Sequence, residues 1–283
     1  MRVGVAGFLP DDPAAIDRAA AESLQALGFA GTSVVLPDPA LYGDSEMFRI
    51  RDVLADSGVQ VAQANPRYHS LVGPEEVRRA GVAALRAACR CARCLRAANV
   101  YVRPGSLNPR GSWLPHPLNT SAETLAELTS SLRQAASVAE GEGVVLALEG
   151  HVLSPLDSPA RVRQVIDEVG SPALAFNVDP VNFAGTLADA YGTRGLIDRL
   201  FDELGDRTVC AHLKDVRVED RLVLHLVECA PGEGLLDLPF FLTSFERHCP
   251  TGYVLIEHLP PELVPAAKRA VDEALHRAGL RWS

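Results

Sequence analysis

The chain has 283 residues, of which 47% are hydrophobic and 22% charged, and its net charge of −9 combines 27 Lys and Arg with 36 Asp and Glu. This acidic balance argues against a nucleic-acid partner, because phosphate backbones are bound mainly by Lys and Arg. No stretch reaches the roughly 18 apolar residues of a membrane span. The first apolar run passes directly into Asp11 and Asp12 instead of a signal-peptide cleavage site, so we expect a cytoplasmic protein with no membrane segment.

The cysteines agree with that compartment. Six cysteines in a chain of this length do not form a disulfide framework. Cys89, Cys91 and Cys94 lie in an Ala- and Arg-rich helical pattern without the paired C-x-x-C arrangement of zinc sites, and we expect buried helical thiols.

In the first half of the chain, apolar runs alternate with helical patterns. Proline and acidic residues near the helix starts support the helix predictions. A long loop, Pro104–Asn119, follows the fourth run and carries Trp113 and His116. The predicted strands are Arg2–Phe8, Thr32–Leu36, Val59–Ala64 and Asn99–Arg103, and the predicted helices are 12–27, Ser45–Asp56 and 74–98.

The same alternation continues in the second half. Thr120 and Glu123 form a capping-box pattern that opens a helix. An extra strand at Arg221–Val227 and a turn at Pro231–Gly234 interrupt the alternation after the seventh run. The predicted strands are Val144–Glu149, Ala173–Asp179, Thr208–Leu213 and Tyr253–Glu257; further helices are predicted at 158–169, within 187–204, at Leu238–His248 and from Val264 to Gly279.

Eight strand–helix repeats predict a single α/β domain over residues 1–283, a (β/α)₈ TIM barrel. Continuous apolar strands fit a parallel sheet that is buried on both faces. A doubly wound sheet is the alternative, but it predicts a Gly-rich phosphate turn after the first strand. The residues there, Phe8–Asp11, have no glycine.

Four consecutive strands end in polar side chains that a buried strand does not need: Glu149, Asp179, His212 and Glu257. The carboxyl ends of barrel strands share one face, so these side chains should meet. One such acid alone is more often a helix cap or a solvated loop residue, and it is the fourfold repetition that favours a shared role. Three carboxylates and an imidazole suit one divalent metal ion, first Mn²⁺, with Mg²⁺, Co²⁺ or Zn²⁺ as alternatives.

Five short motifs make a resemblance specific. In order along the chain, the sequence resembles the xylose isomerase-like TIM barrel superfamily of sugar and sugar-phosphate isomerases and epimerases. The resemblance implies that Glu149, Asp179, His212 and Glu257 are the metal ligands, and that Glu149 and Glu257 are also the catalytic proton-transfer pair. The motifs are ALEGH (147–151), NVDPVN (177–182), HLKDV (212–216), PGEG (231–234) and LIEH (255–258).

Such an enzyme removes a proton alpha to the carbonyl of a ketose, cyclitol ketone or related small sugar through a metal-stabilised enediolate. Around the metal we nominate five substrate-binding residues, each of which also has an ordinary structural interpretation as a loop contact or ion pair. They are Arg103, Trp113, His151, Asn182 and Lys214. Many relatives have histidine at the position of Asn182, which puts its role in doubt.

Three other functions remain open. Lyases of the same superfamily, such as inosose dehydratases or 3-keto-sugar eliminases, share the proton abstraction and then expel a β substituent. Endonuclease IV shares the barrel but uses three metals and more histidines, and it fits poorly with a net charge of −9. A barrel that acts only as one subunit of a complex is the third, and the sequence also leaves a homo-oligomer open.

Overall fold

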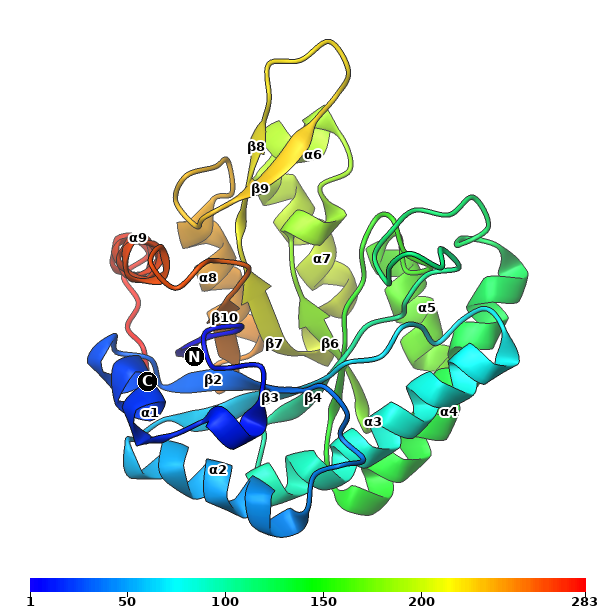
Figure 1. The fold of residues 1–283 in the computed structure, drawn as a ribbon. Coiled ribbons are helices and arrows are strands. Elements are labelled where there is room, and N and C mark those ends of the chain that lie inside the picture. The colour runs from blue at the N-terminus through cyan, green and yellow to red at the C-terminus, as the bar shows by residue number, and fades with distance from the viewer.

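The protein is built around a closed parallel barrel (Figure 1). The computed structural model describes residues 1–283. The strands follow one another in the order β1-β10-β7-β6-β5-β4-β3-β2, and β1 pairs with both β10 and β2 to close the ring. The barrel strands are β1 (Arg2–Val5), β2 (Gly31–Leu36), β3 (Gln60–Pro66), β4 (Asn99–Val102), β5 (Leu146–Leu148), β6 (Leu174–Val178), β7 (Thr208–Leu213) and β10 (Tyr253–Ile256).

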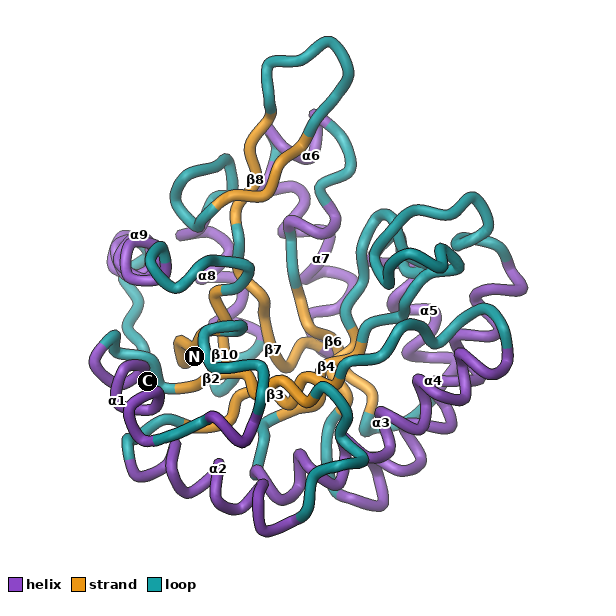
Figure 2. Tube along the Cα trace, viewed as in Figure 1, coloured by secondary structure: helices purple, strands orange, loops and turns teal.

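Helices surround the barrel on its outside (Figure 2). Several begin where an acidic or hydroxyl side chain accepts a hydrogen bond from a free backbone N–H, as Asp17 does from Ala20 and Ser121 from Thr124. The helices are α1 (Arg18–Ala26), α2 (Asp44–Asp56), α3 (Glu75–Leu95), α4 (Ala122–Glu142), α5 (Pro159–Val169), α6 (Leu187–Tyr191), α7 (Thr193–Leu204), α8 (Leu238–His248) and α9 (Val264–Arg277), with 3₁₀ turns η1 (Pro13–Ala15), η2 (Val181–Phe183) and η3 (Gly205–Arg207).

The core fills the space between this helical layer and the strands. A single cluster of 68 buried hydrophobic residues joins the two layers. Strands β2 and β6 are buried at every position, which fits their mainly apolar sequence. The helices contribute an apolar stripe each, for example Met47, Ile50 and Leu54 of α2.

The prediction of a single (β/α)₈ barrel is confirmed. Two predicted helices are shorter than expected, for local reasons. The first is interrupted because Ile16 and Asp17 have extended backbones, so that Asp17 caps α1. The third ends at Leu95 because Arg96 takes a left-handed conformation with φ of 52°.

The predicted extra strand at Arg221–Val227 is wrong in its bounds. An antiparallel hairpin follows β7, formed by β8 (Asp215–Val218) and β9 (Leu226–Cys229). Residues 219–225 form its exposed tip, where Leu222 is fully solvated and can support no buried strand. The hairpin rises above the barrel at the top of Figure 1.

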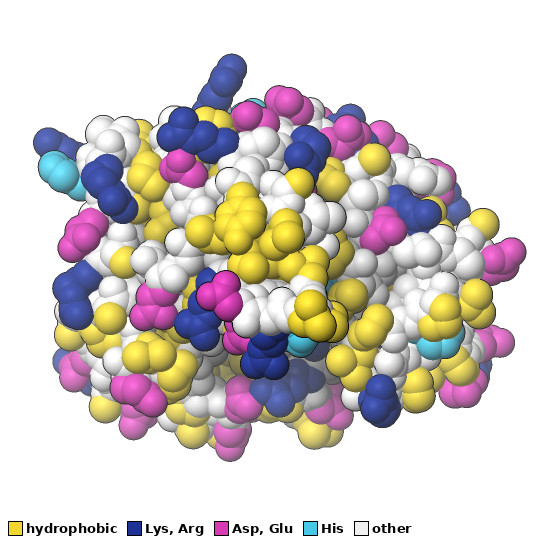
Figure 3. All heavy atoms as spheres, turned by 90° about the horizontal axis from the view of Figure 1, so that it is seen from above, with side chains coloured by type: hydrophobic (Ala, Val, Ile, Leu, Met, Phe, Trp, Pro, Cys, Tyr) yellow, Lys and Arg dark blue, Asp and Glu magenta, His cyan; other side chains and the backbone are white.

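The carboxyl ends of the strands therefore carry the long connections, as this architecture requires of its functional face. These connections are the segment between β4 and α4 and the hairpin after β7. Seen from above, hydrophobic side chains gather over the middle of this face, with charged side chains around them (Figure 3). None of the helices combines the length and the apolar content that a bilayer span requires.

Candidate active site

The four predicted strand-end residues meet at this face. Glu149 follows β5, Asp179 follows β6, His212 lies near the end of β7, and Glu257 follows β10. All four side chains are buried, with exposures between 0% and 5%. His212 Nδ1 lies 2.9 Å from Glu149 Oε1 and 2.9 Å from Glu257 Oε2. The structure thus joins residues that are far apart in the sequence, as the barrel geometry predicted.

Lys214 completes the cluster. Its Nζ lies 2.7 Å from Asp179 Oδ2 and 2.8 Å from Glu257 Oε1, with Glu228 Oε2 at 3.5 Å. Lys214 is only 4% exposed, so its ammonium group neutralises acids inside the protein. Burial would lower the pKa of Lys214, but Asp179 and Glu257 outweigh it and raise that pKa well above its ordinary value.

The donor set suits a cation, although no three His, Cys, Asp or Glu side chains form a ready-made metal cage. Two buried atoms, His212 Nδ1 and Asp179 Oδ2, lie near opposite charges but make no well-aligned hydrogen bond. An imidazole nitrogen and a carboxylate oxygen without aligned hydrogen bonds can both act as ligands of a divalent metal ion. A metal would have to take the place of the proton on His212 and share the acids with Lys214.

Burial and charge shift the titration of the cluster in opposite directions. Burial, opposed by Lys214, raises the pKa of Asp179 to about 7. For His212, burial would lower the pKa, but the carboxylates of Glu257 and Glu149 outweigh it and raise the pKa to about 10. Burial likewise acts to raise the pKa of Glu257, yet His212 and Lys214 hold it well below its ordinary value.

Two residues that the sequence did not single out hold Glu149. Tyr101 donates its hydroxyl to Glu149 Oε2 at 2.6 Å, and Asn177 donates its amide Nδ2 to Glu149 Oε1 at 2.8 Å. The signal for both was present, since Tyr101 and Asn177 are polar positions within mainly apolar strands. Glu257 has no such neutral donors and faces His212 and Lys214 instead.

Three of the nominated substrate residues lie together beside the cluster. His151 and Asn182 line a cavity of about 360 Å³ that also reaches Lys214 and Glu228. The ring of Trp113 lies 5.7 Å from the ring of His151, at the edge of this region. Burial lowers the pKa of His151 to about 4, so the ring is neutral near pH 7.

Arg103 is more constrained than its position suggested. One of its terminal nitrogens, Nη2, donates to Pro66 O at 2.7 Å and contacts Asn65 Oδ1 at 3.3 Å. Its guanidinium lies over the rings of Tyr68 and Tyr101. Arg103 therefore has a packing role in addition to the substrate contact that we predict for it.

Glu228, which lines the cavity, pairs with the exposed His258, and neither residue was nominated. His258 Nδ1 lies 3.0 Å from Glu228 Oε1. Glu228 comes from β9, so the hairpin brings it to the site. The predicted strand, Arg221–Val227, ended one residue before Glu228, so it gave no indication of the position of Glu228.

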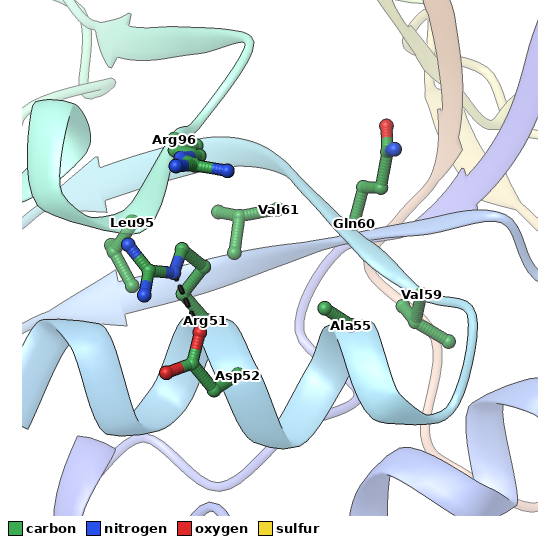
Figure 4. Close-up of a pocket in the computed structure, with 8 residues that line it drawn as sticks. All are labelled: Arg51, Asp52, Ala55, Val59, Gln60, Val61, Leu95 and Arg96. Atoms are coloured by element: carbon green, nitrogen blue, oxygen red, sulfur yellow. Dashed lines mark hydrogen bonds and ion pairs between the residues drawn. The ribbon is translucent and has the colours of Figure 1, made fainter.

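Another cavity, of about 280 Å³, lies between α2 and the beginning of β3 (Figure 4). It is lined by the beginning of β3 together with residues of α2 and the end of α3, among them Arg51, Asp52 and Arg96. Arg51 is paired with its neighbour Asp52. Functional residues of this fold lie at the carboxyl ends of the strands, so this cavity is no part of the active site.

Comparison with known families matches residues 21–282 to the family described as xylose isomerase-like TIM barrel. The chain belongs to the xylose isomerase-like TIM barrel family. This match covers nearly the whole barrel, including all four strand-end residues, and it confirms the resemblance carried by the five motifs.

Individual proteins are similar to this chain either over a short stretch of sequence or in fold. The 2-epi-5-epi-valiolone 7-phosphate 2-epimerase of Actinoplanes sp. is 44% identical over 63 residues, which cover 22% of this chain and 22% of that enzyme. A D-tagatose 3-epimerase-like protein superposes with a TM-score of 0.76 at 17% identity, covering 99% and 98% of the two chains. A Mycobacterium smegmatis protein solved in complex with magnesium gives 0.73 at 16% identity, covering 97% and 95%.

Proposed function

We propose that this protein is a divalent-metal-dependent isomerase or epimerase of a ketose, a cyclitol ketone or a related small carbonyl sugar. The observation that carries the proposal is the convergence of Glu149, Asp179, His212 and Glu257 with buried donor atoms that lack aligned hydrogen bonds. These four residues would hold one ion, and Mn²⁺ is our first choice. When bound, the ion would act as a Lewis acid that offsets the negative charge of the enediolate.

The protein supplies the proton transfers. Glu149 and Glu257 each place one carboxylate oxygen 2.9 Å from His212 Nδ1, so the two carboxylates converge on the same atom. One carboxylate would remove the proton alpha to the carbonyl, and the other would return a proton to the other face or the neighbouring carbon. Tyr101 would hold Glu149 Oε2 in place, while Lys214 would hold Glu257 Oε1.

The surroundings favour a small polyol as substrate. The cavity of about 360 Å³ beside Lys214 has His151 and Asn182 for hydroxyl contacts, and we place Trp113 at its edge as an aromatic wall. Lys214 and Arg103 are both engaged by protein groups, which favours an unphosphorylated sugar or cyclitol. The short match to an epimerase for a 7-phosphate makes phosphorylated ketones the second set to test.

The test is a screen of ketoses and inososes, free and phosphorylated, in deuterated water with added Mn²⁺. We expect solvent deuterium to enter an epimerised or isomerised product of unchanged formula. Loss of water or of a β substituent would instead assign the chain to the lyases of the family. Failure to bind any divalent ion would contradict the proposal itself.

Glu257→Gln tests the catalytic assignment. We expect at least a 10³-fold loss of deuterium exchange, in line with the loss of a positioned base, with the fold intact by circular dichroism. Glu262→Gln is the matched control, because Glu262 is an exposed acid five residues further along the chain. Equal exchange rates in the two variants would contradict the role of Glu257.

A further inference from the structure

Three amide side chains lie inside the barrel directly beneath the site. Gln63 of β3, Asn99 of β4 and Asn177 of β6 are each no more than 1% exposed. Burying an amide costs free energy unless its donors and acceptors are bonded. Here the amides bond to one another and to two of the predicted metal ligands, His212 and Glu149.

A backbone carbonyl sets the direction of the whole network. Asn99 donates its Nδ2 to Ala62 O at 3.2 Å, and a carbonyl oxygen can only accept. Asn99 Oδ1 must therefore be the acceptor for Gln63 Nε2, 2.9 Å away. This leaves Gln63 Oε1 as the atom that faces His212 Nε2 at 2.9 Å. Turning either amide over would place two acceptors or two donors in contact.

The direction of the network decides what His212 presents to the site. Because Gln63 Oε1 accepts, His212 Nε2 carries the hydrogen and donates it downward into the barrel. Its other nitrogen, Nδ1, then faces Glu149 and Glu257. With the hydrogen on Nε2, the lone pair of Nδ1 is free to bind a metal ion. With the hydrogen on Nδ1, the lone pair would instead lie on Nε2, inside the barrel.

A second branch reaches Glu149. The remaining hydrogen of Gln63 Nε2 points to Asn177 Oδ1 at 3.4 Å. With its oxygen used as an acceptor, Asn177 donates Nδ2 to Glu149 Oε1 at 2.8 Å. One glutamine thus contacts His212 directly and Glu149 through a single intermediate.

We propose that Gln63 is a positioning residue, whose amide fixes the ring orientation of His212 and the carboxylate of Glu149 for binding of a divalent cation. This inference rests on the proposed function for the identity of the ligands. A histidine that binds a metal usually donates the hydrogen of its other ring nitrogen to a partner, and mutation of that partner typically costs about 10- to 100-fold in metal affinity or activity. Gln63 supplies that partner from inside the barrel, where its side chain is 0% exposed.

The test compares three variants. Gln63→Met keeps the length of the side chain and removes the acceptor, whereas Gln63→Glu keeps an acceptor for His212 Nε2. Gln60→Met is the matched control, because Gln60 lies on the same strand with an exposed side chain that bonds Arg2 and Tyr253. Calorimetric titration with Mn²⁺ alone measures affinity, and ¹⁵N-histidine NMR of the metal-free protein reports the His212 Nε2–H proton.

We expect Gln63→Met to weaken Mn²⁺ binding by about 10-fold or more and to lose the hydrogen-bonded Nε2–H signal. Gln63→Glu should retain the Nε2–H signal because it keeps the acceptor for His212, although it loses the donor to Asn99 and Asn177. Gln60→Met should retain both the signal and the affinity. Mn²⁺ affinity of Gln63→Met within twofold of the unchanged protein, or an unaltered Nε2–H signal, would overturn the inference. If the unchanged protein fails to bind Mn²⁺, the proposed function is contradicted, and the NMR signal still decides whether Gln63 orients His212.

Discussion

At the scale of single residues, Lys214 lies between two of the predicted metal ligands. We predicted a substrate contact, with an ion pair as the alternative, and its ammonium group forms ion pairs with Asp179 Oδ2 and Glu257 Oε1. Asp179 Oδ1 already accepts from the backbone N–H of Val181 at 3.0 Å, so Oδ2 is the oxygen left for a cation. Lys214 and a bound metal would therefore meet at the same two acids, and their like charges would repel.

Replacing this lysine should separate metal affinity from stability. We expect Lys214→Met to tighten Mn²⁺ binding by about tenfold, or ~1.4 kcal/mol, because it removes a competing positive charge. The metal-free variant should melt at a lower temperature, since Asp179 and Glu257 lose a buried counter-charge. Calorimetric titration and thermal denaturation with and without Mn²⁺ measure the two effects.

Lys268→Met is the control for loss of a buried lysine. Lys268 is 7% exposed and pairs with Asp272 on α9, away from the site. The Lys268→Met variant should have a lower melting temperature and an unchanged Mn²⁺ affinity. Weaker Mn²⁺ binding by Lys214→Met than by the control would show that Lys214 supports the ion instead of competing with it.

At the scale of elements, Asp215 determines how the hairpin and the following turn are held. Its buried carboxylate accepts four backbone N–H groups, from Val216, Gly232, Gly234 and Leu236, at 2.8–3.0 Å. A Cβ on Gly234 would lie 2.3 Å from Asp215 Oδ1, so only glycine allows this approach. The PGEG motif is thus explained as the partner of Asp215, and through β9 this contact also positions Glu228 beside Lys214.

Asp215→Asn should loosen this element selectively. An amide replaces one of the two accepting oxygens by an NH₂ group, which would face two backbone N–H donors, and it removes the charge from the bonds to the other oxygen. Charge-assisted bonds of this kind contribute about 1.5–3 kcal/mol each. We expect amide hydrogen exchange over residues 216–236 to accelerate at least tenfold, while the barrel strands stay protected. Glu233→Gln, an exposed acid in the same turn, should leave exchange unchanged. Unaltered protection of this segment in Asp215→Asn would show that other contacts hold the hairpin.

At the scale of the whole molecule, the barrel and the meeting of Glu149, Asp179, His212 and Glu257 could be predicted because both depend on regular features. Apolar periodicity marks each strand, and parallel strands in a barrel bring their carboxyl ends to one face. Contacts between side chains have no such regularity. Gln63 and His212 are 149 residues apart, and only the strand register places them 2.9 Å from each other. The bounds of the hairpin strands were mispredicted for a related reason. These strands are half exposed, and their pairing depends on Asp215.

The charge on His212 links the stability of the whole protein to pH and to metal. Because its pKa in the folded protein is raised to about 10, this charge stabilises the metal-free fold fully below the ordinary pKa of about 6.5. The contribution is lost as the pH rises from there through about 10. Metal binding has the opposite sign, because an ion on Nδ1 requires the proton to leave. Affinity for Mn²⁺ should therefore increase with pH, by up to about tenfold per pH unit.

We accordingly expect Mn²⁺ to raise the melting temperature more at pH 8.0 than at pH 6.5. Calorimetric titrations at pH 8.0 in buffers of different ionisation enthalpy should show the release of about one proton per ion. The pKa of Asp179 is about 7, so this acid is already largely ionised at pH 8.0. His212 is therefore the group that must lose its proton. His248→Gln, which removes a histidine stacked on Phe201 away from the site, should release the same number. Binding without net proton release would mean that His212 keeps its hydrogen and that the ion is held by the acids alone.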